Sequence, residues 1–419
     1  MPVIISLSPW SSFWTMGREG GTSSDFLAVE ALKKINPQVL HFVEDGSPCD
    51  DGNITIPVHL ENRHNLLSRI LKRLGLIGHR YVFKVTEKRW RKYNEDFLTQ
   101  VIAELKKRNV NSVDLVYCHT ALLVECGRQL GMIFKCPAVS HFYGTFLAPC
   151  IGNQDAYLMH PTEYLGWITP VDLRICLDDG TRGLEVAKDL SLPLDKFLFQ
   201  PHGLDTNELN SENQIDVSEF LKPDTLHVMT ASRLAVWKRL DRLLKAIPDL
   251  IKNVKNVQFL ILGDGPERQK LENLSRDLKI TKYVRFVSSV SRKTVFALMQ
   301  KCDVFVSTND VSNLSQGLKE AMYFGMCVVT LDTGDTHQLI KDGVTGRLLR
   351  PDDTSALSKA LTEVLTQPDI RIRLRQSAKD FIEKHEPTLD TVMTDRVSVL
   401  KSLIEEARKH LEETNESPE

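Results

Sequence analysis

The sequence predicts an α/β protein with two doubly wound domains, and three observations support this prediction. Short apolar segments alternate with segments that have the spacing of amphipathic helices, a pattern typical of parallel sheets covered on both faces. The length of 419 residues favours two domains over one or four. A hydrophobic content of 42% and a charged content of 26% fit a chain with a full core.

The expected elements follow this alternation along the chain. Strands are expected in the first half at 3–7, 39–43, 113–118, 138–141, 173–177 and 197–200, and in the second half at 226–230, 257–262, 284–287, 304–306 and 328–331. Helices are expected in the first half at 22–34, 95–107, 121–130 and 182–190. We therefore expect one domain over 1–202 and a second over 203–385. A C-terminal helix with a polar tail, over 386–419, is expected to pack back towards the first domain.

Charge and cysteine usage restrict the function classes. The net charge of −2 gives no overall attraction to nucleic acid, so no nucleic-acid partner is expected. The N-terminus, MPVIISLSPW, has no basic region and reads as a first strand, not a signal peptide. The eight cysteines form no CxxC pair, and most lie in apolar contexts, which indicates reduced thiols and a cytoplasmic protein.

The segment from Asp303 to Val329 carries the strongest functional signal. The expected strand at 304–306 runs into a polar loop, and Gly317 then opens a short helix. Free N–H groups and the helix dipole make such a helix start a binding site for phosphate, here around Ser315, Gln316 and Gly317. Glu320 is expected in the first turn, where its carboxylate could accept hydrogen bonds from ribose hydroxyls.

This segment resembles the donor-site motif of glycosyltransferase family 4, through Gly317-Leu318-Lys319-Glu320-Ala321-Met322, Gly325 and Val328-Val329. The resemblance implies the GT-B fold, with two Rossmann-like domains facing across a cleft. It also implies a retaining, metal-independent transferase that moves a sugar from a UDP- or GDP-sugar to an acceptor hydroxyl, with no further cofactor. The family motif has two glutamates eight positions apart. Glu320 matches the second, and Ser312 stands in place of the first.

Two cations follow the first strand of the second domain. Arg233 and Lys238 resemble the family's Arg-Leu pair with a Lys five positions after the Arg. On a loop between strand and helix they would neutralise a departing nucleoside diphosphate, so we expect them to be catalytic. The alternative is a pair of solvated basic residues. The turn Gly263-Asp264-Gly265 matches a family turn that lines the nucleotide pocket, although a simple strand-to-helix turn would also account for it.

The first domain carries weaker signals. Gly20 and Gly21 match the family's glycine-rich loop, whose backbone closes over the diphosphate, and a flexible loop is the alternative. His141, at the end of a strand, matches a histidine beside the transferred sugar, and the alternative is a structural histidine. No carboxylate of this domain stands out as a general base, and Asp178-Asp179 reads as a strand end. No metal-ligand spacing is present.

A basic segment interrupts the nearly neutral average of the chain. Residues 63–92 hold ten Lys or Arg residues against one acid, Glu87. Such a segment can contact an anionic membrane surface, which would place the protein peripherally at the inner membrane face, or bind an anionic acceptor. The alternative is a solvated helix face with a basic loop. Two alternatives to the transferase stay open: a nucleotide-sugar 2-epimerase of GT-B fold and a non-catalytic sugar-nucleotide-binding protein.

Overall fold

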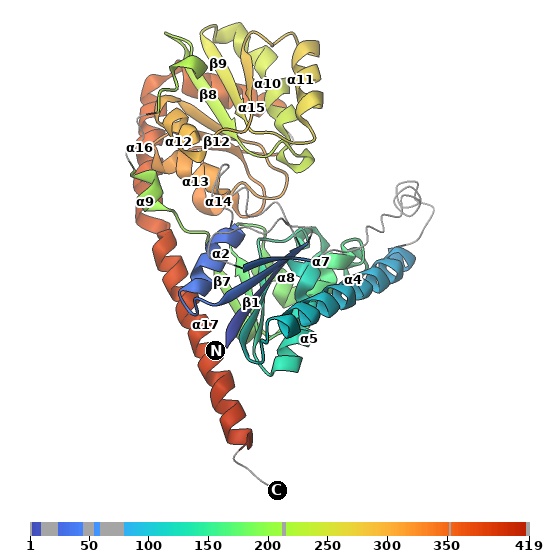
Figure 1. Ribbon diagram of the computed structural model, residues 1–419. Helices are drawn as coiled ribbons and strands as arrows, with labels where there is room; N and C mark the ends of the chain where they lie inside the picture. The colour runs from blue at the N-terminus through green and yellow to red at the C-terminus, as the bar shows by residue number, and fades with distance from the viewer. Residues whose placement is uncertain are drawn as a thin grey trace.

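The protein is described by a computed structural model, shown in Figure 1. The described residues are 2–9, 24–44, 54–58, 79–211, 215–351 and 353–415. They form two parallel sheets, each flanked by helices, with one sheet in each half of the chain. This arrangement confirms the predicted α/β fold of two doubly wound domains.

The first sheet has seven strands in the order β3-β2-β1-β4-β5-β6-β7. The strands are β1 (Val3–Ser8), β2 (Val39–Glu44), β3 (Ile54–Val58), β4 (Val113–His119), β5 (Ala138–Phe142), β6 (Leu173–Leu177) and β7 (Phe197–Gln200). The helices are α2 (Ser24–Lys33), α4 (His79–Lys107), α5 (Val124–Phe134), α6 (Gln154–Tyr157), α7 (Pro161–Ile168) and α8 (Gly183–Asp189). The strand order reverses between β1 and β4, which is where doubly wound sheets bind ligands.

The second sheet has six strands in the order β10-β9-β8-β11-β12-β13. The strands are β8 (Leu226–Ala231), β9 (Val257–Leu262), β10 (Val284–Val287), β11 (Val304–Ser307), β12 (Cys327–Leu331) and β13 (Arg347–Leu349). The helices are α9 (Thr206–Leu209), α10 (Leu240–Asn253), α11 (Arg268–Asp277), α12 (Arg292–Lys301), α13 (Gln316–Tyr323), α14 (Thr336–Leu339), α15 (Thr354–Thr366), α16 (Pro368–His385) and α17 (Leu389–Asn415). Here the order reverses between β8 and β11.

Two strands and most of one helix were not expected from the sequence. Both missed strands, β3 and β13, lie at the edge of a sheet. An edge strand can be short and can tolerate Pro57, so its sequence carries little of the usual strand pattern. Helix α4 begins at His79, well before the expected start at 95, because its first half is dominated by charged residues that hide the apolar spacing.

Each sheet is buried on both faces, as the continuous apolar strands require. In β1, Val3, Ile5 and Leu7 pack with α4 and α5 residues, whereas Ile4 packs on the opposite face with α2. The second sheet divides in the same way between two clusters, one under α10 and α15 and the other under α12 and α13. The strands are therefore rigid, and their carboxyl ends hold the loops that follow them in fixed positions.

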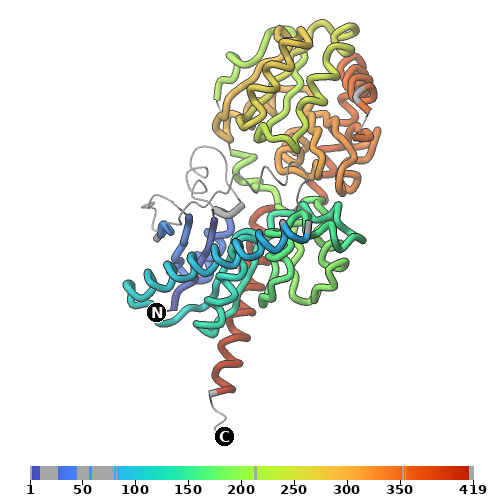
Figure 2. The backbone as a smooth tube through the Cα atoms, turned by 90° about the vertical axis from the view of Figure 1, so that its right-hand side faces the viewer, coloured from blue at the N-terminus to red at the C-terminus, as the bar shows by residue number. Residues whose placement is uncertain are grey.

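The chain crosses between the domains at two neighbouring places. It enters the second domain near Leu204 and leaves it near Thr388, and these two segments are hydrogen-bonded to each other. The N–H of Leu204 donates to Pro387 O (2.9 Å), and the N–H of Leu389 donates to Leu204 O (2.7 Å). Helix α17 then runs along the first domain (Figures 1 and 2), where Leu400 and Ile404 are buried in the same cluster as residues of α2.

Two further findings concern the described residues only. None of their helices is both long enough and apolar enough to span a membrane. Their seven cysteines are all free thiols, and Cys49 lies outside the described part of the chain.

Candidate active site at the carboxyl ends of the strands

The loops that follow β8 and β11 flank the reversal point of the second sheet. They carry most of the predicted site residues. Thr308, after β11, donates its hydroxyl to Lys238 O (3.0 Å), and the N–H of Asp310 donates to Trp237 O (2.9 Å). Arg242 adds an ion pair from α10 to Asp310 (2.6 Å). These bonds join the two loops into one unit at the edge where a ligand is expected.

Lys238 and Arg233 both lie on the loop after β8. Lys238 ends a short 3₁₀ helix, Val236–Lys238, and its side chain is partly buried. Burial lowers the pKa of Lys238, and the negative charge of Asp179 raises it. Arg233 is exposed. Within the described residues neither cation makes an ion pair, so both charges remain available for an anionic ligand.

The turn Gly263-Asp264-Gly265 packs directly on the loop after β8. Gly263 has φ of +124°, and a Cβ at this position would lie 2.1 Å from Ser232 O. Gly265 is equally constrained, since a Cβ there would lie 2.4 Å from Leu234 O. The N–H of Leu234 donates to Asp264 O (2.8 Å). These glycines are therefore required by the close approach of two backbones, and they position the loop that carries Arg233 and Lys238.

Helix α13 begins next to the end of β8, the strand that precedes the loop with these cations. Its N-cap is Ser315, whose hydroxyl accepts from the N–H of Leu318 (3.4 Å). The N–H groups of Gln316 and Gly317 belong to the first turn, where a helix has no internal acceptors. A Cβ at Gly317 would make only an ordinary contact, 3.6 Å from Ala231 O. The fold itself therefore does not require glycine at 317, in contrast to 263 and 265.

Glu320 lies in a different environment from the expected one. It is the fifth residue of α13 and belongs to the second turn, so the expectation of a first-turn position is wrong: the helix begins one residue before Gly317. Glu320 is 3% exposed and forms an ion pair with Arg292 (2.6 Å), which also pairs with Glu208 (2.5 Å). Burial raises the pKa of Glu320 to about 7, against the opposing pull of Arg292.

Asn313 is a site residue that the sequence did not reveal. It is completely buried, and its side-chain oxygen accepts from the N–H of Asn309 (3.0 Å). Its amide nitrogen donates to Leu331 O (2.9 Å) and to the hydroxyl of Thr333 (2.7 Å). Asn313 thus ties the loop after β11 to the loop after β12. A single Asn in a polar loop gives no pattern by which this role could be recognised.

His141 belongs to a buried network in the first domain. It is 1% exposed, and its Nδ1 is bonded to the hydroxyl of Tyr117 (2.8 Å), whereas its Nε2 has no hydrogen-bond partner. His119, at the end of β4, bonds Ser6 through Nε2 and Tyr143 through Nδ1, both at 2.9 Å. Burial lowers the pKa of His141 well below its usual value, so the ring is neutral. Its role beside the transferred sugar stays a prediction.

Other predicted residues lie partly or wholly outside the described part of the chain. Gly20 and Gly21 lie outside it, as do residues 63–78 of the basic segment. The remaining basic residues of the segment belong to α4, where Arg91 pairs with Glu87 (2.9 Å) and Lys92 with Asp96 (2.6 Å). This part of the segment therefore includes ion pairs on an exposed helix face.

The two domains meet where the carboxyl ends of their strands face each other. The hydroxyl of Ser312, after β11, donates to Asp179 O (2.6 Å), after β6. The N–H of Asp335, after β12, donates to Gly180 O (3.1 Å). Phe146 of the first domain also contacts Trp237 of the second, edge to face, with ring centroids 6.2 Å apart. The site loops of the second domain are thus in direct contact with the first.

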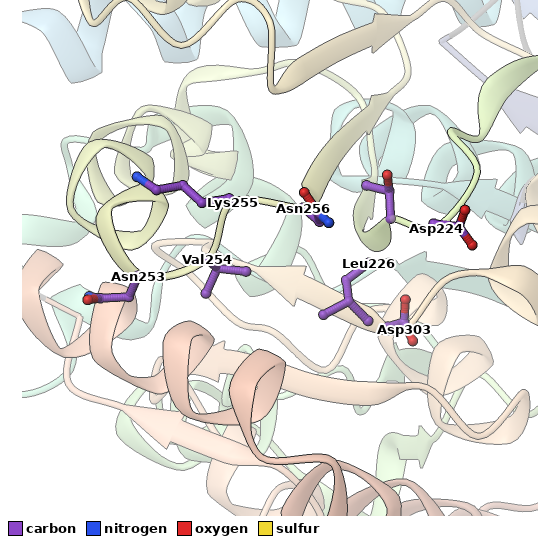
Figure 3. Close-up of a pocket in the computed structure, with 8 residues that line it drawn as sticks. Asp224, Leu226, Asn253, Val254, Lys255, Asn256 and Asp303 are labelled. Carbon is purple, nitrogen blue, oxygen red and sulfur yellow. The ribbon is translucent and has the colours of Figure 1, made fainter.

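A pocket elsewhere on the second domain is not part of this site (Figure 3). It lies at the amino ends of β8, β9 and β11, at the edge of the sheet opposite to the loops described above. It is lined by Asp224, Thr225, Leu226, Asn253, Val254, Lys255, Asn256 and Asp303. Because doubly wound sheets bind ligands at their carboxyl edge, we assign it no role.

The chain is similar to known glycosyltransferases. Residues 211–381 match the family model described as Glycosyl transferases group 1. The chain is 25% identical over 305 residues to an uncharacterized glycosyltransferase of Methanocaldococcus jannaschii, which covers 71% of this chain and 77% of that protein. It is 34% identical over 185 residues to a Campylobacter jejuni enzyme named as an α-1,4-N-acetyl-D-galactosaminyltransferase of an undecaprenol-linked saccharide; this alignment covers 43% of this chain and half of the relative.

Among solved structures, Anabaena HepE in complex with UDP superimposes with a TM-score of 0.69 at 15% identity. The superposition covers 96% of this chain and 100% of the other. The second sheet and its loops lie within the region matched by the family model, and both sheets are included in the structural superposition. Residues 211–381 therefore match the domain of group 1 glycosyltransferases, and the two domains together have the GT-B fold.

Proposed function

We propose that the protein transfers a sugar from a nucleotide diphosphate sugar to an acceptor hydroxyl, with retention of configuration and without an obligatory metal ion. One observation carries this proposal: Arg233 and Lys238, which make no ion pair among the described residues, lie on the loop after β8, and α13 begins after the neighbouring strand β11, so both flank the reversal point of the second sheet. Two cations and a set of free N–H groups at one place are suited to a diphosphate, whose charge increases as the sugar departs.

The absence of a side chain at Gly317 supports the same assignment. Since protein packing does not require glycine there, close approach of a ligand to the backbone explains it. The partly buried position of Lys238 strengthens its interaction with a bound anion, because the charge is less screened than at the surface. HepE, which shares the fold, binds UDP in its solved structure.

The reaction follows from this placement of charge. The bond between the anomeric carbon and the diphosphate oxygen breaks, and its electron pair stays on the diphosphate, which Arg233, Lys238 and the first N–H groups of α13 stabilise. The acceptor oxygen bonds to the same face of the anomeric carbon. Its proton passes to the leaving diphosphate, so this scheme needs no protein base.

The role of Glu320 must be compatible with its ion pair. Its carboxylate has two oxygens, and the hydrogen bond from Arg292 (2.6 Å) goes to Oε1. We propose that the other oxygen accepts a hydrogen bond from a ribose hydroxyl of the nucleotide. Arg292 would then keep the carboxylate charged against the effect of burial and fix its orientation.

The acceptor is proposed to be a hydroxyl of a glycan or a glycolipid. The Campylobacter relative acts on an undecaprenol-linked saccharide by its name. A lipid-linked acceptor would also fit contact between residues 63–92 and an anionic membrane, as proposed from the ten basic residues of that segment.

Incubation with a panel of UDP-, GDP- and ADP-sugars tests the proposed function. Transfer to a saccharide acceptor with the anomeric configuration of the donor, persisting in EDTA, is the expected result. Conversion of the donor to its C2 epimer without acceptor would instead identify a 2-epimerase. Binding without turnover of any donor, under conditions in which a known group 1 transferase is active, would identify a non-catalytic sugar-nucleotide-binding protein.

A further inference from the structure

The loop after β6 reaches from the first domain into the site of the second. Its residues 178–181 are held from the other side by two hydrogen bonds, from Ser312 to Asp179 O (2.6 Å) and from Asp335 to Gly180 O (3.1 Å). The two donors follow β11 and β12. Asp179 is thereby fixed at the junction of the domains, beside the loop that ends in the first turn of α13.

The Asp179 carboxylate has a defined orientation. Its Oδ1 accepts from both the N–H (3.1 Å) and the hydroxyl (2.6 Å) of Thr181. Its Oδ2 accepts no hydrogen bond from any other residue that the structure describes. This oxygen points towards Gly144, where an added Cβ would lie only 2.3 Å away. A side chain at 144 would therefore collide with the carboxylate, which explains a glycine with φ of +82° at this place.

Lys238 of the second domain lies close to this carboxylate without touching it. Burial lowers the pKa of Lys238, and the negative charge of Asp179 opposes this shift, so the two charges interact. Yet no oxygen of Asp179 lies within 4.0 Å of the Lys238 ammonium, the limit for an ion pair among the described residues. A carboxylate and an ammonium that interact without forming an ion pair can both contact a ligand bound at the junction of the domains.

We propose that Asp179 contacts the substrate, and that its Oδ2 accepts a hydrogen bond from a hydroxyl of the saccharide held between the domains. The proposal rests on the proposed function, because it takes Lys238 as the contact to the diphosphate. The group next to that diphosphate is a sugar rich in hydroxyls, and a carboxylate is the strongest acceptor that a protein offers to a hydroxyl.

This assignment also gives Ser312 a role. The position where the resemblance expects a glutamate carries a hydroxyl, which anchors the backbone of Asp179. The carboxylate of Asp179 thus comes from the first domain, while Arg233 and Lys238 come from the second. Sugar recognition is complete only when both domains are in the relative position seen here.

The test compares Asp179→Asn with Asp178→Asn. The Asn side chain keeps the acceptor for Thr181 and replaces Oδ2 by an amide donor, whereas Asp178 is the exposed neighbour with no side-chain contact in the site. Calorimetry measures the affinity of each variant for a nucleoside diphosphate and for the nucleotide sugar identified in the donor panel. Turnover and donor hydrolysis are measured in parallel.

Asp179→Asn is expected to bind the nucleoside diphosphate like the wild type and to lose about 10- to 100-fold in kcat/KM, as expected for a hydrogen bond to a charged group. A hydroxyl of the donor sugar is indicated if nucleotide-sugar affinity and hydrolysis also fall. An acceptor hydroxyl is indicated if hydrolysis persists and the KM for acceptor rises. Asp178→Asn should behave like the wild type.

Wild-type kcat/KM in a folded Asp179→Asn variant overturns the proposal and leaves the proposed function standing, since the active wild type serves as reference. Equal losses in both variants also overturn it, because they would indicate a general effect of charge. Asp179→Ser, which is smaller and still offers an oxygen to Thr181, replaces Asp179→Asn if the latter does not fold, and the same outcomes apply.

Discussion

The carboxyl edges of the two sheets differ in how their loops are held. In the second domain, a turn with two glycines lies against the loop after β8, and the backbones of Leu234 and Asp264 are bonded directly (2.8 Å). In the first domain, the side chains of Ser6, His119 and Tyr143 form a network between strand ends. The glycine-containing turn can therefore be recognised as a short local motif, whereas the network of the first domain depends on residues that are far apart in the sequence.

The largest expected effect on turnover comes from the two cations at the carboxyl edge of the second sheet. Lys238→Ala and Arg233→Ala should each lower kcat by about 10²-fold or more, because each removes a charge directed at the leaving diphosphate. Steady-state kinetics with the identified donor measures this. Lys245→Ala is the matched control, since Lys245 pairs with Asp241 on the exposed side of α10. Near wild-type turnover in both cation variants would remove them from the mechanism.

Two glycine substitutions distinguish a glycine that the fold requires from a glycine that ligand binding requires. Gly263→Ala should lower the free energy of unfolding by about 2–4 kcal/mol, since the new Cβ collides with Ser232 O and the residue keeps a positive φ. Gly317→Ala should leave this free energy unchanged or raise it by up to about 1 kcal/mol, because Ala is the better helix former.

Gly317→Ala should nevertheless weaken binding of nucleoside diphosphate. Denaturant titration and calorimetry of the two variants give both quantities. If Gly317→Ala binds nucleotide as tightly as the wild type, the backbone of this turn does not approach the ligand, and the difference between the two glycines has no functional meaning.

Glu320→Ala should weaken nucleoside diphosphate binding by about 1–3 kcal/mol, because it removes a charged acceptor. Glu208→Ala serves as the control, since it removes the other carboxylate of Arg292 and leaves Glu320 in place. Calorimetry distinguishes the two variants. Equal losses would show that the carboxylates act through Arg292, and unchanged affinity in a folded Glu320→Ala protein would exclude the ribose contact.

Low pH should destabilise the first domain through its buried histidines. Burial lowers the folded-state pKa of His41 and His141 well below 6.5. The unfolded chain therefore binds more protons below pH 6.5, and stability falls as the pH decreases through this range. Between pH 6.5 and 5.5 the loss amounts to up to about 1 kcal/mol per histidine. Denaturant titrations of the wild type and of His41→Gln should show a smaller pH dependence in the variant.

The smallest effect per residue is expected in the basic segment. Arg69, Lys72 and Arg73 should each contribute about 1 kcal/mol to binding of an anionic membrane, and the attraction should fade as salt rises. Flotation with anionic liposomes tests the wild type against the variant in which all three are changed to Glu. Turnover of a short soluble acceptor should survive in the variant. A wild-type protein that stays with the soluble fraction at low salt excludes membrane contact through this segment.

Particular residues show how much of the fold and of the site could be predicted from the sequence. The strands of both sheets were predicted except β3 and β13, because a strand buried on both faces must be a continuous apolar run. The grouping of Arg233, Lys238 and Gly317 around a diphosphate came from the resemblance to the family motif and stays a prediction. The predicted start of α13 was wrong by one residue, which moves Glu320 from the first turn to the second, since helix starts are determined by capping contacts such as that of Ser315.

The contacts between the domains could not be predicted. Asp179 reads as the end of a strand, and only the placement of one domain on the other brings it near Lys238 and Ser312. Asn313 was likewise missed, because its side-chain hydrogen bonds join Asn309, Leu331 and Thr333, which are separated along the chain. Both depend on tertiary arrangement, which a motif of a few neighbouring residues does not specify.

The paired crossings at Leu204 and Thr388 have a mechanical consequence. Two strands of chain that are bonded side by side resist twisting about their common direction and permit bending across it. The two connections thus favour a hinge rotation that opens the domains over a twist of one domain against the other. Helix α17 fixes these connections to the first domain, because it begins at them and is packed along that domain through Leu400 and Ile404. Loss of α17 would leave a single anchored connection, and the Asp179 carboxylate of one domain would no longer return to the same position relative to Lys238 of the other.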